Sequence, residues 1–273
     1  MEWSKIKNII LLILLTLNLI LLIIVGDQQY QSVQVAQNTR FQVLQILSEN
    51  GVTVSEEVIP DAASLPVLQI DRAALTSQEG VDLLGIGTEK ENTGGRVVYC
   101  SAKGEMELYS NGRFLTHCTP GAFPVSGGQE AAEGRKALEE MGLSVRFLEE
   151  KQENGVITVT YCQMWDGVPV FDALCSAVFE DGSLQTLSGQ RITGTSTELE
   201  LWPLPDVPTT LIQFLNWKNE ERLVFSSITS MEAGYQSSTG RSSLLAPVWC
   251  ITTETGRYVV DTEGNIEALE PVV

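Results

Sequence analysis

The sequence predicts an α+β protein in which a single N-terminal transmembrane helix precedes repeated modules, each made of one helix and one antiparallel sheet. Two observations predict this class. Residues 9–26 are almost wholly apolar and carry no charge. Beyond them, an amphipathic helical segment followed by several alternating segments occurs twice, once from residue 126 and again from residue 201. This order of elements is typical of helices that pack on one face of an antiparallel sheet.

The apolar run Ile9–Val25 reads IILLILLTLNLILLIIV, and only Thr16 and Asn18 in it are polar. With its flanks, a helix of this length spans the roughly 30 Å hydrocarbon layer of a bilayer. A polar side chain within a span can hydrogen-bond a neighbouring transmembrane helix, for about 0.6–2 kcal/mol. Thr16 and Asn18 are therefore candidate contacts with a partner helix; the alternative is that lipid tolerates a single amide without one.

The residues on either side of the run predict its orientation. Lys5 and Lys7 precede it, whereas Asp27 and neutral residues follow it. The positive-inside rule then keeps the first eight residues in the cytoplasm and places the rest of the chain outside, with Trp3 as an anchor at the headgroup level. A cleaved signal peptide is the rival interpretation, but it calls for a shorter apolar core and a small-x-small cleavage site. The sequence therefore favours an uncleaved anchor in the cell membrane.

The composition excludes some ligand classes. The 273 residues include 35 acidic and 17 basic side chains, for a net charge of −18. Such a surface repels nucleic acids and other polyanions, and the longest basic stretch is the pair Arg135-Lys136. About 245 residues follow the anchor, which is enough for one large domain or two small ones.

The five cysteines predict buried thiols rather than a metal or redox site. Their number is odd, none shows C-x-x-C spacing, and each follows an apolar, strand-like segment. A turn at Asp166-Gly167 would place Cys162 opposite Phe171, which argues against a bond between Cys162 and Cys175.

Proline and glycine clusters at 119–128 and 201–208 suggest where the chain divides. We expect five segments: a cytoplasmic N-terminus (1–8), the transmembrane helix (9–26), an extracytoplasmic helix with a first β-rich domain (27–125), a first module (126–200) and a second module (201–273).

Local patterns predict the elements in each segment. A helix should run from Gln28 to Leu47 and stop at Asn50-Gly51, and a short helix is expected near Ser77–Leu84. Two more helices are expected at 128–141, capped by Ser126 and stopped by Gly142, and at 209–221. Strands are expected at 52–58, 96–102, 105–109, 113–118, 144–149, 156–165, 168–179, 184–192, 223–235, 244–253, 256–261 and 265–269.

Glycine-containing turns separate several of these strands. Asn111-Gly112 predicts a type I′ hairpin, and turns are also expected at Asn154-Gly155, Asp166-Gly167 and Asp181-Gly182. Residues 60–95 otherwise show no clear pattern.

Three local signatures together resemble one known family, over nearly the whole chain. They lie at the start, in the middle and at the end of the sequence: Met1–Lys7 followed by a span with Leu17-Asn18; Gly167–Phe171 with Asp181–Leu184; and Ala246–Trp249 with Gly256–Asp261 and Gly264–Ile266. In this order and spacing they resemble the YycI family of Gram-positive bacteria, relatives of YycH, and the sheet modules resemble PepSY-type domains.

The resemblance implies a function. Members of that family are single-pass membrane accessories of the WalK-type (YycG) sensor histidine kinase, which governs cell-wall metabolism. They contact the kinase through the transmembrane helix and the outer domain, and they often act with a YycH partner. The resemblance therefore implies a kinase partner, with a YycH-like protein as a second partner.

The residues themselves predict no enzyme and no cofactor. The chain has one histidine, His117, next to Cys118 at a strand end. Neighbours on a strand point to opposite faces, so the two side chains are poorly placed to cooperate. The pair Gly85 and Gly87 lacks the third glycine of a dinucleotide site, and Asp261–Asn265 lacks the distal glutamate of a calcium loop. The sequence thus predicts neither catalytic nor metal-binding residues.

Three hypotheses follow. The first is a regulator that binds a kinase through the anchor, with Trp3, Lys5, Lys7, Thr16 and Asn18 at the membrane and partner interface. The second is an extracytoplasmic module that binds a peptide or cell-wall fragment in a groove lined by Trp165, Trp202, Trp217 and Trp249, although such residues are more often core. The third is a hydrolase or a peptidase inhibitor, by analogy with PepSY propeptides. Exposed sheet edges are also candidates for pairing with a second copy or a relative.

Overall fold

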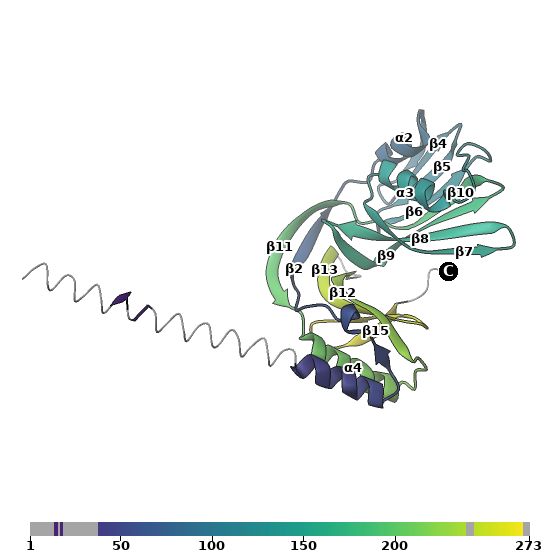
Figure 1. Cartoon of the computed structure of the whole chain (residues 1–273). Helices are drawn as coiled ribbons and strands as arrows, with labels where there is room; N and C mark the ends of the chain where they lie inside the picture. The colour runs from purple at the N-terminus through teal and green to yellow at the C-terminus, as the bar shows by residue number, and fades with distance from the viewer. Residues whose placement is uncertain (1–13, 16, 19–37, 239–242, 270–273) are drawn as a thin grey trace, which may run out of the picture.

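The computed structural model describes residues 14–15, 17–18, 38–238 and 243–269, which form two lobes of α+β structure joined by a long ribbon (Figure 1). The predicted α+β class is confirmed for these residues. Among them, no helix is both long and apolar enough to cross a bilayer. The predicted span at residues 9–26 lies mostly outside the described residues, so it stays a prediction.

The upper lobe is an eight-stranded antiparallel sheet with two helices on one face. The strands are arranged in the order β3-β4-β5-β6-β10-β9-β8-β7. The helices are α2 (Gln78–Leu84) and α3 (Glu130–Glu140). The strands are β3 (Gly87–Asn92), β4 (Arg96–Ser101), β5 (Gly104–Tyr109), β6 (Arg113–Cys118), β7 (Val145–Glu153), β8 (Val156–Trp165), β9 (Val168–Glu180) and β10 (Ser183–Gln190).

One core fills the space between these helices and the sheet. Leu84 of α2 and Leu138 of α3 are buried in it, together with alternate residues of the strands, such as Val159 and Tyr161 of β8. Because successive strand residues point to opposite faces, the residues between these core positions point to the other face of the sheet. No described helix of the upper lobe covers that face (Figure 1).

The lower lobe is made of segments from both ends of the described chain. It contains a helix over residues 38–49, β1 (Thr53–Val54), a 3-10 helix (Glu56–Val58), α4 (Val207–Glu220), β12 (Ser227–Ser237), β13 (Ser243–Thr253), β14 (Arg257–Val260) and β15 (Ile266–Leu269). The helix over residues 38–49 lies beside α4 (Figure 1), and its Val43 and Leu47 are buried against α4 residues, including Leu211. Trp249 of β13 is fully buried there, and its indole Nε1 donates a hydrogen bond to the Pro205 carbonyl at 2.9 Å.

Strands β2 (Ser64–Arg72) and β11 (Gly194–Pro203) pair with each other and form the ribbon between the lobes. β2 also pairs with β13, and β12 meets β9 in parallel at Tyr235 and Val170. All fifteen strands of the described chain thus belong to one hydrogen-bonded sheet. At the meeting of β9 and β12, Gly234 leaves no room for a side chain, since a Cβ there would lie 2.6 Å from the Phe171 ring.

The order of one helix followed by four strands occurs three times in the described residues: α2 with β3–β6, α3 with β7–β10, and α4 with β12–β15. The second set lies within residues 126–200, and the third lies within residues 201–273. The first lies inside segment 27–125. The core of the upper lobe contains residues from both sides of residue 125, whereas the predicted boundaries divide the chain only along the sequence. The structure does not test the division at residues 125 and 200, so it stays a prediction.

Some local expectations were wrong. The expected strand at 52–58 shortens to β1 and a 3-10 helix, and β2, β3 and β11 were not expected at all. Gln129, rather than Ser126, occupies the N-cap of α3. Cys162 lies opposite Leu174 instead of Phe171, because the pairing of β8 and β9 shifts register after Cys162.

The glycine turns divide into two kinds. Asn154, Asp166 and Asp181 have φ values of 51°, 48° and 51°, and each precedes a glycine with positive φ, as a type I′ turn requires. Asn111 lacks the positive φ, so the type I′ prediction there was wrong. The turn closes one residue earlier instead, since the Gly112 N–H donates to the Tyr109 carbonyl at 3.0 Å.

The packing of the helix over residues 38–49 can be tested with Leu47→Ala. Leu47 is 0% exposed, so its truncation should leave a cavity and lower the free energy of unfolding by about 2–5 kcal/mol. The matched control is Phe41→Ala on the same helix, where the side chain is 69% exposed and the expected change is within about 0.5 kcal/mol. Urea denaturation of the full chain measures both. Equal effects of the two substitutions would contradict this packing.

Candidate binding cleft between the two lobes

A cleft of about 670 Å³ lies between the helix-free faces of the two lobes. Its upper wall comes from β7, β8 and β9, and its lower wall from β12, β13 and the β14–β15 hairpin. The lining residues that carry the argument below are Thr160, Leu174, Ser230, Glu232, Glu254 and Arg257.

Strand alternation explains why these side chains reach the cleft. Tyr161 belongs to the core under α3, so its neighbour Thr160 points to the opposite face, which is the cleft wall. In the same way, Trp249 and Ile251 face α4, whereas Cys250 between them faces the other lobe. The cleft is therefore a consequence of having helices on the outer face of each sheet.

A buried apolar cluster joins the two lobes. Phe171 of the upper lobe packs with Val248, Cys250 and Val259 of the lower lobe, and none of the four is more than 2% exposed. The guanidinium of Arg257 lies 5.7 Å above the Phe171 ring, a cation–π distance. These contacts join the two lobes, and Arg257 connects the cluster to the cleft lining.

A bidentate ion pair crosses between the lobes beside this cluster. Both terminal nitrogens of Arg146 on β7 lie 2.7 Å from the carboxylate oxygens of Glu232 on β12. The hydrogen bonds that Arg146 donates to Glu232 raise the pKa of Arg146 above its usual value. Each side chain is about a third exposed, so solvent screens the pair and it adds little stability. Its two parallel hydrogen bonds instead fix the position of one wall relative to the other.

Glu254 orders the rim of the lower wall. It caps the chain before β12, because its carboxylate accepts hydrogen bonds from the backbone N–H and the hydroxyl of both Ser226 and Ser227. These bonds, led by the one from the Ser226 N–H, lower the pKa of Glu254 to about 2. The carboxylate is thus held ionised and in place.

The cleft brings together threonines, serines, charged groups and apolar side chains, which suit hydrogen bonding and packing of an extended polar ligand. The nearby thiols are unsuited to attack on a substrate. Burial raises the pKa of Cys162 to about 11 and that of Cys175 to about 12, and it also raises the pKa of Cys250. All five cysteines are free. His117 is exposed on β6, and it does not line the cleft.

Most of the predicted interface residues lie outside the described part of the chain. These are Trp3, Lys5, Lys7 and Thr16, so their roles stay predictions. Asn18 is described: it is helical and exposed, and its amide nitrogen donates to the Leu14 carbonyl at 3.0 Å. This local bond satisfies one donor of the amide and leaves the partner hypothesis untested.

Of the tryptophans weighed as a groove, Trp165, Trp217 and Trp249 do not line the cleft, and the side chain of Trp202 is outside the described part of the structure. Trp249 is fully buried, Trp217 stacks on Phe214, and Trp165 packs on the core at the ribbon. Sequence reasoning missed the residues that do form the walls, such as Glu232, Glu254 and Arg257. They come from segments that are distant in sequence, and no local motif indicates that they meet.

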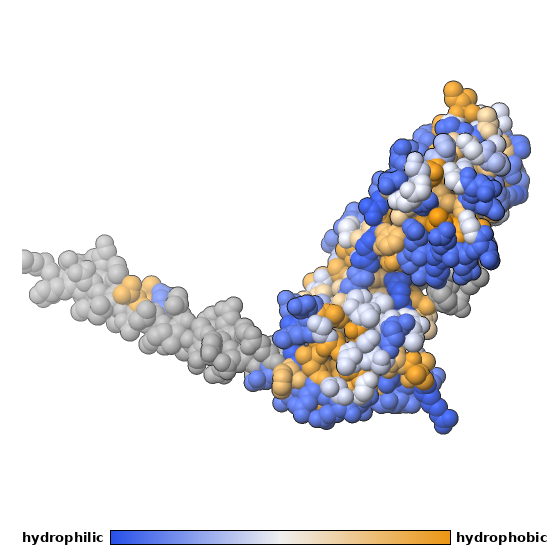
Figure 2. All heavy atoms as spheres, turned by 45° about the vertical axis from the view of Figure 1, so that its right-hand side comes forward, coloured by the Kyte–Doolittle hydropathy of each residue, from blue (hydrophilic) through white to orange (hydrophobic). Residues whose placement is uncertain are grey.

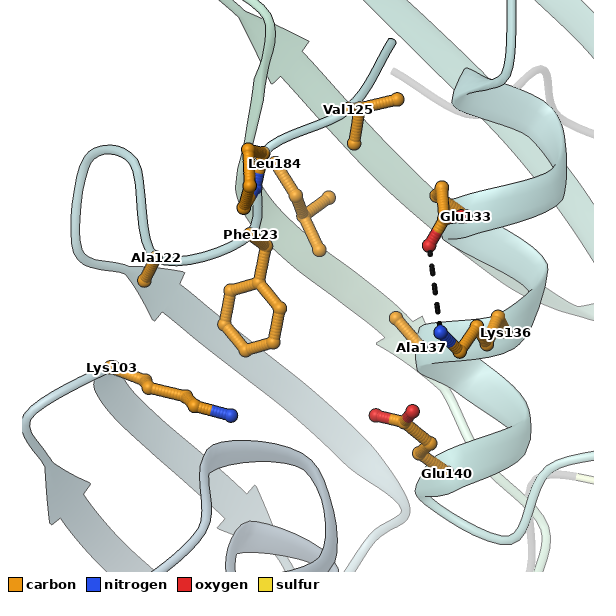
Figure 3. A pocket seen from close by; sticks show the side chains of 10 residues that line it. Lys103, Ala122, Phe123, Val125, Glu133, Lys136, Ala137, Glu140 and Leu184 are labelled. Atoms are coloured by element: carbon orange, nitrogen blue, oxygen red, sulfur yellow. Dashed lines mark ion pairs between the residues drawn. The ribbon is translucent and has the colours of Figure 1, made fainter.

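A second, smaller pocket of about 280 Å³ lies between α3 and the loop before it (Figure 3). Lys103 lies 5.3 Å over the Phe123 ring, and Lys136 pairs with Glu133 at 4.0 Å. Figure 3 also shows the Lys103 and Glu140 side chains pointing toward one another. Because opposite charges already face each other here, the pocket has less to offer a ligand than the cleft.

The surface agrees with the composition. Figure 2 shows hydrophilic residues over much of the upper lobe, with hydrophobic residues among polar ones on the lower lobe. The fold and cleft together define an α+β protein whose helix-and-meander units frame a binding-sized cleft.

Comparisons with known proteins give distant similarities. No protein-family profile and no curated protein matches the sequence. Among solved structures, an uncharacterized protein from Eubacterium rectale ATCC 33656 is 10% identical, with 77% of this chain and 82% of that chain covered and a TM-score of 0.44. The C-terminal domain of YpeB from Bacillus megaterium is 13% identical, with coverage of 80% and 99% and a TM-score of 0.36.

YycH from Bacillus subtilis is 10% identical and has a TM-score of 0.42; the match covers 75% of this chain and 52% of that one. Similarities at this level do not place the chain in a family.

The hydrogen bonds to Glu254 predict that the stability of the protein falls at acidic pH. Because its pKa is lowered in the folded state, it contributes stability above its unfolded pKa of 4.5, and this contribution is lost as the pH falls toward 2. Glu254→Gln should therefore flatten the loss of thermal stability between about pH 5 and about pH 2. Glu149→Gln, at a second carboxylate on the cleft wall that pairs with Lys151, is the control and should follow the wild type. Identical acid profiles for the wild type and Glu254→Gln would refute the assignment.

Proposed function

We propose that the protein is a membrane-anchored accessory regulator of a sensor histidine kinase that controls cell-wall metabolism, with the domain after Asp27 outside the membrane. The observation that carries this proposal is the charge-free apolar run Ile9–Val25, which is long enough to span a bilayer and is preceded by Lys5 and Lys7. The resemblance of three sequence signatures to the YycI family supports the kinase as the partner.

The lower lobe offers a physical route between the outer domain and the membrane. The helix over residues 38–49 is the first described element after the predicted span, and Val43 and Leu47 fix it into the lower core. A displacement of the lower lobe therefore also displaces the start of this helix. Phe41, which is 69% exposed on the same helix, is available for contact with a partner just outside the membrane.

The regulation we propose is a shift of population. An accessory protein biases a kinase only by binding one of its states more tightly than the other, and a tenfold preference corresponds to about 1.4 kcal/mol. A single interhelical hydrogen bond from Asn18 supplies about 0.6–2 kcal/mol, which is of that size. This regulation needs no catalytic step and no cofactor. We also propose a YycH-like protein as a second partner, as the resemblance to the YycI family implies.

An anchor exchange tests the proposal. The segment Ile9–Val25 is replaced by an unrelated spanning sequence of equal length, and the full protein is expressed with the kinase. We expect co-purification with the kinase to fall and the effect on its output to be lost, because the interhelical contacts are gone. The matched control restores Thr16 and Asn18 within the foreign span and should recover part of the association. Unchanged co-purification and unchanged kinase output after the exchange would discard the proposal.

The cleft favours a second candidate function, the binding of a peptide or cell-wall fragment, which would then be the input to regulation. Its volume suits a ligand of several residues, and its walls carry both hydrogen-bonding and apolar side chains. The two functions are compatible, because a ligand held by both lobes changes how they are tied together.

Ligand binding in the cleft predicts a difference between two adjacent substitutions. Ser230→Trp places an indole in the cleft and should abolish thermal stabilisation of the full chain by cell-wall peptides. Thr229→Trp is the matched control, because Thr229 is exposed and lies outside the cleft lining. A wild-type protein that no wall fragment stabilises, or equal stabilisation of both variants, would count against the cleft as the site.

A further inference from the structure

A small cavity of about 110 Å³ lies where the upper lobe meets the β2–β11 ribbon, apart from the cleft. It is built from four places in the sequence: the end of β2 with the residues after it, Gly94 between β3 and β4, the β5–β6 hairpin, and the link between β10 and β11. Arg72, Tyr109, Gly112, Arg191 and Thr193 are among the residues that line it. Of the described residues, no Asp or Glu is in this lining.

Arg191 is the most buried charged group in this cavity. Its side chain is 6% exposed, and its Nη1 donates to Glu79 at 2.6 Å and to the Thr193 hydroxyl at 3.0 Å. Its Nε is buried, and it has no hydrogen-bond partner among the described residues. A buried guanidinium N–H without an acceptor is costly, so Arg191 can use one more acceptor. Glu79 Oε2 is likewise buried without a hydrogen-bond partner among the described residues.

The charge around the cavity favours an anion as that acceptor. Two guanidinium groups line the cavity, and Glu79 on α2 stands behind one of them. Burial raises the pKa of Glu79 in spite of Arg191, and burial, with a smaller contribution from the Arg72 charge, lowers the pKa of Arg191. Both shifts follow mainly from desolvation of the charged forms, and the like charge of Arg72 adds to the shift at Arg191.

The β5–β6 hairpin lies close to both arginines. Gly112 has a φ of 92°, and a Cβ there would lie 2.5 Å from the Arg191 carbonyl and 3.4 Å from Nη1 of Arg72. Nη1 of Arg72 also donates to the Ser110 carbonyl at 3.2 Å, which holds that side chain against the hairpin. Only glycine fits this position, which lets the hairpin lie directly against the Arg191 backbone and the Arg72 side chain.

We propose that this cavity binds a small oxyanion, a carboxylate or phosphate group, between Arg72 and Arg191. Guanidinium groups match the geometry of such oxyanions. The net charge of −18 excludes a polyanion over the surface as a whole, but a single anionic group of a ligand can enter a local pair of arginines. A bound anion would bridge β2 to the β10–β11 link, and so would fasten the ribbon to the upper lobe.

Anion titrations of the full chain in detergent test this site. Chloride is replaced by phosphate in one arm and by acetate in the other, at pH 7 and constant ionic strength, and thermal unfolding is followed. At least one anion should give a saturable rise in unfolding temperature. A response to phosphate alone identifies a phosphate group as the ligand, and a response to acetate alone identifies a carboxylate.

Arg72→Gln is the decisive variant, because Arg72 is exposed at the cavity and its loss should leave the fold intact. We expect its half-saturating anion concentration to rise at least tenfold. Lys103→Gln, which removes a cation at the pocket in Figure 3, is the matched control and should titrate as the wild type does. The proposal is overturned if neither anion saturates, or if Arg72→Gln titrates as the wild type does. These outcomes are independent of whether the protein regulates a kinase.

Discussion

The molecule depends on the continuity of its sheet between the lobes. Strand β9 meets β12, and β2 pairs with both β11 and β13, so hydrogen bonds run from one lobe into the other. Each lobe covers one face of its part of the sheet with helices. The remaining faces must then oppose each other, and the cluster around Phe171 excludes water where they touch. The cleft, the interlobe ion pair and the position of the helix over residues 38–49 all follow from this arrangement.

Much of the fold could be predicted from local sequence. Strands β4 to β6, β8, β9 and β13 fall within a few residues of their expected positions, because alternation and Asp-Gly or Asn-Gly turns are local signals. β2, β3 and β11 could not be found in this way. β3 is polar throughout, and β2 and β11 pair with each other across more than a hundred residues, so their partners decide their conformation.

The candidate site was beyond sequence reasoning for a related reason. Arg146 and Glu232 meet across two lobes, and Glu254 acts through backbone groups of Ser226 and Ser227. Such contacts depend on the angle between two sheets, which no spacing along the chain encodes. The tryptophans were correctly weighed as core, since Trp249 and Trp217 pack beneath the lower sheet. The burial of four of the five thiols also agrees with the expectation of small apolar residues in strands.

The absence of a side chain at Gly234 has a mechanical consequence. Backbone and ring atoms of β9 lie where its Cβ would be, so the two strands approach more closely than any other residue would allow. A methyl group at this position would collide with the Phe171 ring and the Pro169 carbonyl, and would push β9 and β12 apart. The spacing between the two lobes is therefore limited by one residue without a side chain.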